Sequence, residues 1–122
     1  MSTANNIGPK RLVVGAHYGL RDWLAQRVTA VMIGVYAVVL FVSALLASEP
    51  GYGGWAGIFA ATWMKVLTLL ALLALIYHAW VGVRDIWMDY VKPVGVRLAL
   101  QIFTILWLVG WGVWAVLILW RV

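Results

Sequence analysis

The chain is organised around one segment, Leu75-Ile-Tyr-His-Ala-Trp-Val-Gly-Val-Arg-Asp-Ile-Trp-Met-Asp-Tyr-Val-Lys-Pro93. It begins inside an apolar run long enough to cross a bilayer and ends in a charged turn before Pro93. The imidazole of His78 lies inside that apolar run, where an ionisable group is costly and by default indicates a functional site with a partner. If the helix continues to Asp89, eleven steps of 100° bring this carboxylate back to within about 20° of His78.

The composition excludes an ordinary soluble domain. Of the 122 residues, 66% are hydrophobic and only 11% are charged, whereas soluble domains are about one quarter charged. The apolar residues form three long blocks, so we predict a single integral membrane domain over residues 1–122. No length remains for a soluble catalytic domain. The chain has no cysteine, which excludes disulfides, iron–sulfur ligation and covalent haem attachment through this chain.

We therefore predict an all-α membrane protein with three transmembrane helices, at about 28–47, 58–83 and 96–120. A polar tail, residues 1–16, precedes a short interfacial helix over 17–27. The breaker sequence Ser48-Glu49-Pro50-Gly51 closes the first span, and a short loop, 51–55, follows it. Pro93 and Gly95 end the second span.

Lysine and arginine residues predict the orientation. Cytoplasmic flanks of membrane helices carry an excess of these two residue types. Four of them precede the first span: Lys10, Arg11, Arg21 and Arg27. Three lie in the turn after the second span: Arg84, Lys92 and Arg97. The C-terminal flank holds only Arg121, and the first loop holds none. We expect the N-terminus and the second turn on the cytoplasmic side and the C-terminus on the periplasmic side. The net charge of +5 is accordingly a topology signal, and no patch suited to nucleic acid is formed.

His78 has two interpretations. It is either a packing histidine that donates a hydrogen bond to a neighbouring helix, or an axial ligand of a haem iron. Gly82, one turn away, leaves room for a flat macrocycle. Because the chain has no second intramembrane histidine, a haem with two histidine ligands would take the other one from a partner subunit.

The polar residues at the cytoplasmic end also have two interpretations each. Tyr90 is either an aromatic-belt residue or a phenol that donates a hydrogen bond to a quinone carbonyl, with Asp89 or an arginine holding it. Asp85 and Asp89 otherwise pair with the basic residues of the second turn. Arg27 faces either lipid phosphates or a haem propionate, for which a planar guanidinium is well suited.

Four motifs carry a family resemblance: Lys65-Val-x-Thr-Leu-Leu-Ala-Leu, His78-Ala-Trp-x-Gly82, Asp89-Tyr-Val-Lys-Pro93 and Arg97-Leu-x-Leu-Gln101. Together they resemble the smaller hydrophobic membrane anchor of succinate dehydrogenase. The pattern is more closely similar to the D subunit of bacterial succinate:ubiquinone oxidoreductase, respiratory complex II. Arg21-Asp22-Trp-Leu-x-x-Arg27-x-Thr-Ala30 resembles the family's approach to its first helix, and the likeness extends over about residues 17–120.

The resemblance implies that His78 is one axial ligand of haem b and that the second anchor, the C subunit, supplies the other histidine. It implies that Tyr90 hydrogen-bonds ubiquinone, that Asp89 belongs to the surround of the quinone site, and that Arg27 lies near a haem propionate. Some relatives carry a histidine at the position of Arg21, so this chain lacks any contribution that such a histidine makes to haem or quinone binding.

The resemblance also implies the setting of the chain. The flavoprotein and iron–sulfur subunits would dock on the cytoplasmic face of the bacterial inner membrane, and this chain would hold no catalytic site for succinate. Electrons would pass from succinate, a tricarboxylic acid cycle intermediate, to ubiquinone in the electron transport chain. Two alternatives remain open at this stage: a haem-free structural scaffold, and the anchor of a menaquinone-linked fumarate reductase.

Overall fold

The computed structural model describes residues 18–122, and these residues form four helices and no strand. They are α1 (Tyr18–Leu45), α2 (Tyr52–Ala60), α3 (Thr62–Tyr90) and α4 (Val94–Arg121). Three of them, α1, α3 and α4, are long and apolar enough to cross a membrane, which confirms the predicted fold class. The predicted polar tail and His17 lie outside the described residues.

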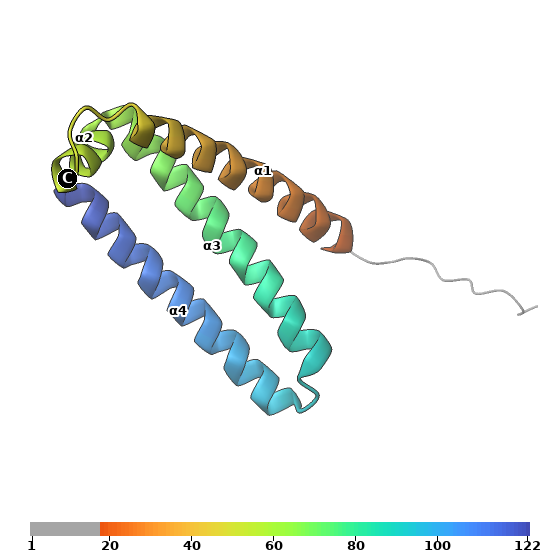
Figure 1. Ribbon diagram of the computed structural model, residues 1–122. Helices are drawn as coiled ribbons and strands as arrows, with labels where there is room; N and C mark the ends of the chain where they lie inside the picture. Colours follow the sequence, from red (N-terminus) through yellow and green to blue (C-terminus); the bar gives the residue numbers. More distant parts are fainter. Residues whose placement is uncertain (1–17) are drawn as a thin grey trace, which may run out of the picture.

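The helix α3 is the centre of the arrangement. It packs against α1 along one side and against α4 along the other, and the short α2 contacts both α3 and α1 (Figure 1). With 29 residues and about 1.5 Å of rise per residue, α3 is longer than the roughly 30 Å hydrocarbon core. Its polar last turns therefore extend beyond the apolar layer.

The first span and the segment before it form one element. Residues 17–27, predicted as a short interfacial helix, are helical from Tyr18 onward and continue without a break to Leu45. No proline or glycine pair interrupts the chain between Leu20 and Leu45, so nothing in the local sequence ends the helix before the breaker sequence.

The predicted loop at 51–55 is wrong, because a separate helix, α2, begins there. Gly51 has φ 72°, the left-handed region that glycine adopts without a steric penalty, and it turns the chain into α2. Trp55 and Phe59 stack one turn apart on this helix, with ring centroids 6.2 Å apart. At Ala61 the backbone is extended (ψ 128°), so the second span begins at Thr62 and not at residue 58.

At its other end α3 runs to Tyr90, beyond the predicted limit of 83. The helix therefore continues from His78 to Asp89, as the predicted placement of these two residues on one helix face requires. The chain is extended at Val91, and Pro93 precedes the first turn of α4, where its carbonyl accepts the Arg97 N–H at 3.0 Å. Gly95 lies inside α4 and does not end a helix.

The buried side chains of α3 are apolar and form one seam: Met64, Ala71, Ala74 and Val81. Their spacing by three or seven residues places them on one helix face, and His78, four residues after Ala74, belongs to the same face. In lipid, helices associate through close packing and interhelical hydrogen bonds, since hydrocarbon surrounds the apolar side chains in any case. The seam thus positions His78 between helices.

Candidate functional site

His78 lies at the interface of α3 with α1. Its Nδ1 is 3.0 Å from Oγ1 of Thr29 on α1, and the side chain is half-buried. A hydrogen bond to a neighbouring helix was one of the two interpretations of this residue, and it is present. It occupies Nδ1 alone, and Nε2 makes no hydrogen bond to any residue in the range 18–122. Packing and ligation use different ring nitrogens here, so the two roles are compatible.

Gly82, one turn beyond His78, faces α1. A Cβ built at this position would lie 3.6 Å from Nε2 of Gln26, which is ordinary van der Waals contact. The glycine therefore leaves a space of about one methyl group between the helices. The other amide atom of Gln26, Oε1, is buried and has no hydrogen-bond partner within the described part of the chain.

A cleft of about 380 Å³ opens between the first turns of α1 and the last turns of α3, one turn from His78; it is lined by Gly19, Asp22, Trp23, Gln26, Arg27, Val81, Arg84 and Asp85. Arg84 connects the two helices, since its guanidinium is 2.5 Å from the Asp22 carboxylate and 3.1 Å from that of Asp85. The predicted pairing of Asp85 with a basic residue is confirmed, whereas the partner of Arg84 on α1 was not predicted.

Arg27 differs from Arg84 in its surroundings. Its guanidinium lies over the ring of Trp23, 5.2 Å from the centroid, and both residues are exposed on α1. Within residues 18–122 Arg27 forms no ion pair. A cation–π contact stabilises the position of a guanidinium while leaving its N–H groups available to an anion.

Asp89 and Tyr90 lie in the last turn of α3, and both are exposed. Asp89 shares the face of His78, whereas Tyr90, twelve steps of 100° away, points about 120° from it and lies about 18 Å along the axis. Tyr90 is 80% exposed. Neither side chain makes a hydrogen bond or ion pair among the described residues, so the structure does not bring Asp89 or an arginine to the Tyr90 hydroxyl.

Of the α1 residues at this site, sequence reasoning gave a role to Arg27 alone and none to Asp22, Gln26 and Thr29. These residues are spaced by four and three, and Tyr36, seven residues later, bonds Thr68 of α3 at 2.8 Å. A polar stripe at this spacing on an apolar helix indicates the face that turns toward a neighbour. That signal was available in the sequence.

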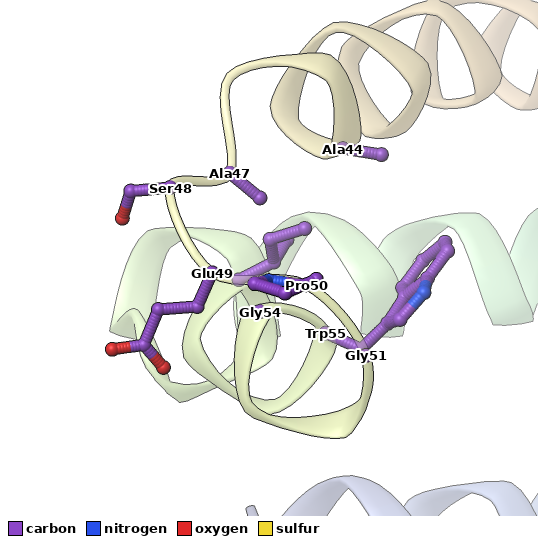
Figure 2. A pocket seen from close by; sticks show the side chains of 9 residues that line it. Ala44, Ala47, Ser48, Glu49, Pro50, Gly51, Gly54 and Trp55 are labelled. Carbon is purple, nitrogen blue, oxygen red and sulfur yellow. The ribbon is translucent and has the colours of Figure 1, made fainter.

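A second hollow, of about 340 Å³, lies at the turn between α1 and α2, at the opposite end of α3 from the cleft (Figure 2). Glu49 is the one charged residue among those that line it. Figure 2 shows its carboxylate and the Ser48 hydroxyl on the outer side of the turn, away from the Trp55 indole. These polar groups do not point toward a common ligand position, so the hollow is not a candidate binding site.

Comparison with known proteins decides the family. Residues 1–118 match the family model described as succinate dehydrogenase/fumarate reductase transmembrane subunit. The chain belongs to this family. It is 42% identical over 102 residues to the succinate dehydrogenase hydrophobic membrane anchor subunit of Coxiella burnetii, which covers 84% of this chain and 89% of that protein.

The predicted resemblance to the succinate dehydrogenase membrane anchor is thereby confirmed. As a membrane anchor subunit of this enzyme, the chain is a multi-pass membrane protein and one part of a larger enzyme complex. Membership implies that the complex has further subunits.

Proposed function

We propose that this anchor subunit co-ligates haem b through His78, together with a histidine of the second anchor subunit. We further propose that it helps to form the ubiquinone reduction site near the cytoplasmic face. Flavoprotein and iron–sulfur subunits docked at that face would deliver the electrons of succinate. The observation that carries the proposal is the setting of His78, a half-buried imidazole inside a membrane-crossing helix with Nδ1 engaged and Nε2 open.

The residues around His78 fit a haem. Ligation of iron requires an unprotonated ring nitrogen, and Nε2 has no competing partner among residues 18–122. Arg27 presents a guanidinium without an ion-pair partner in the described chain, which suits a propionate. The space at Gly82 holds about one methyl group and does not itself make room for a macrocycle. The haem, when bound, supplies one-electron redox chemistry whose potential depends on its axial ligands and their hydrogen bonds.

The other axial ligand comes from a partner subunit in this proposal. The chain contains only two histidines, and His17 precedes the first span. A second imidazole ligand would therefore come from a helix of the partner subunit.

Tyr90 and Asp89 serve the quinone in this proposal. The Tyr90 phenol is exposed at the end of α3, and its hydroxyl is available to donate a hydrogen bond to a quinone carbonyl. Such a donor stabilises the negative charge that develops on the carbonyl oxygen during reduction. Asp89 precedes Tyr90 in the exposed last turn of α3, and in this proposal it belongs to the surround of the quinone site or to its proton path. The lysine and arginine distribution supports a cytoplasmic location for this end of α3.

The test is a reduced-minus-oxidised visible spectrum of the complex purified in mild detergent, for wild type and His78→Ala. We expect a b-type signal in the wild type that is lost or distorted in the variant. His17→Ala is the matched control, because it removes the other histidine of the chain and should leave the spectrum unchanged. A wild-type complex without haem, or an unaltered haem in His78→Ala, would refute the proposed ligation.

A further inference from the structure

The Thr29 hydroxyl has three polar contacts. The residue is 9% exposed, and Thr29 and Thr104 are the two buried polar side chains among residues 19–122. Its Oγ1 lies 2.6 Å from the Ala25 carbonyl oxygen, 3.2 Å from that of Gln26 and 3.0 Å from His78 Nδ1. The hydroxyl has a single hydrogen, so only one of these contacts can be a strong donation.

The oxygen–oxygen contact decides where that hydrogen goes. A carbonyl cannot donate, and two oxygen atoms 2.6 Å apart repel unless a hydrogen lies between them. The Thr29 hydroxyl therefore donates to Ala25, one helical turn back. Its oxygen is left as an acceptor toward His78, so the hydrogen in that contact belongs to Nδ1.

Thr104 shows the same arrangement with an unambiguous direction. Its hydroxyl donates to the Leu100 carbonyl at 2.8 Å and lies 3.0 Å from Nε1 of Trp87 on α3. An indole nitrogen only donates, so the threonine oxygen accepts. At both interfaces a threonine donates to its own helix and accepts a hydrogen bond from a ring N–H of α3.

We propose that Thr29 is a positioning residue for the axial ligand, selecting the His78 tautomer with hydrogen on Nδ1 and the lone pair on Nε2. This inference rests on the proposed haem ligation. A neutral imidazole carries one ring hydrogen, and a ligand needs the other nitrogen bare. Because the Thr29 oxygen accepts from Nδ1, the ligating form is selected and the ring plane is held before haem enters.

The hydrogen bond would also change the properties of a bound haem iron. An imidazole that donates from Nδ1 is a more basic ligand at Nε2. A more basic ligand stabilises the ferric state more than the ferrous state, so Thr29 would keep the haem midpoint potential lower than it would be without the bond. Loss of such a supporting contact typically weakens metal binding by about 10- to 100-fold.

Thr29→Val in the assembled complex tests this role, because valine keeps the shape and removes the acceptor. We expect the haem midpoint potential, measured by redox titration of the visible spectrum, to shift to a more positive value. If the ferric form is weakened about tenfold relative to the ferrous form, the shift is about 59 mV for a one-electron couple. Thr29→Ser, which keeps the hydroxyl, should restore the wild-type potential.

Thr104→Val is the matched control. It removes a buried hydroxyl with the same backbone contact from the other interface of α3, so it perturbs packing without touching His78. We expect its midpoint potential to equal that of the wild type. Equal shifts in both valine variants would overturn the inference, because they would report a general effect of loosened helices.

Thr29→Cys keeps the inference testable if Thr29→Val does not assemble, because sulfur is a weaker acceptor of similar size. The potentials should then increase from serine to cysteine. Identical potentials for threonine, serine and cysteine, with haem present, would refute the role of Thr29 and leave ligation by His78 intact. Haem retained in His78→Ala would instead refute the proposed function itself.

Discussion

The ion pair between Arg84 of α3 and Asp22 of α1 can be tested by a double-mutant cycle. Arg84→Gln, Asp22→Asn and the combined variant remove the charges while keeping side chains of similar size. Arg84 donates to Asp22 across the helix interface and to Asp85 on its own helix. The cycle isolates the interhelical contact, because Asp85 is present in all four proteins.

The magnitude follows from the partial burial of the pair. The side chains of Arg84 and Asp22 are each 26% exposed. Fully exposed pairs contribute about 0.2–1 kcal/mol, whereas removing one partner of a fully buried pair costs about 3–5 kcal/mol. We therefore expect a coupling energy of about 1–2 kcal/mol, between these limits.

The two single variants should not be equal. Asp22→Asn leaves Arg84 with a second carboxylate, that of Asp85, whose side chain is 56% exposed. Arg84→Gln leaves Asp22 without a cation, because no other ion pair involves it among residues 18–122. We expect the arginine variant to be the more destabilised of the two.

The assay is titration of the purified complex with sodium dodecyl sulfate in mixed micelles, with the folded fraction followed by helical circular dichroism. The coupling should decrease as ionic strength rises, because salt screens a pair that is partly open to water. Single-variant effects that add to within about 0.3 kcal/mol would refute the reasoning, since unpaired side chains do not couple.

Two further predictions concern the ends of α3 and α2. Tyr90→Phe should leave assembly and the haem spectrum unchanged, because the residue is 80% exposed and its hydroxyl has no partner among residues 18–122. Succinate:quinone reductase activity should fall by about 10²- to 10³-fold, while reduction of an artificial acceptor by the soluble subunits persists; equal quinone activity would contradict the role of Tyr90. Gly51→Ala should lower the free energy of unfolding in the same detergent titration by about 1–3 kcal/mol, because Gly51 has φ 72° and ψ −150°. Gly57→Ala, at a helical position with open space around it, should instead raise the free energy of unfolding by about 0.5–1 kcal/mol. A lower free energy of unfolding in both variants would contradict the argument from backbone conformation.

Sequence reasoning located the three spans well because their signal is local. A helix satisfies its own backbone hydrogen bonds, and a bilayer requires about 20 apolar residues in a row. Pro93 stopped α3 as predicted, since proline cannot continue the preceding helix. The helix α2 was missed because the turn at Gly51 and the extended backbone at Ala61 separate it from its neighbours. Neither dihedral angle is encoded in the hydropathy of the segment.

The residues of the candidate site also fall into two groups, those identified from the sequence and those found only in the folded chain. His78 was identified from one property, an imidazole in an apolar run, and its alternative contact to a neighbouring helix is confirmed. Thr29 was not identified, because a threonine in a membrane helix often bonds only its own backbone. The pairing of Arg84 with Asp22 was not identified either, since the two residues are 62 positions apart.

The number of spans, the place of His78 within one of them and the family resemblance could all be read from the sequence. These properties depend on local hydropathy, on helix geometry and on short motifs. The side chain of α1 that contacts His78 could be identified only in the packed helices, because it depends on the rotation of each helix about its axis. This rotation is set by the packing of α1 and α4 on the two sides of α3, a balance of contacts that no single segment contains.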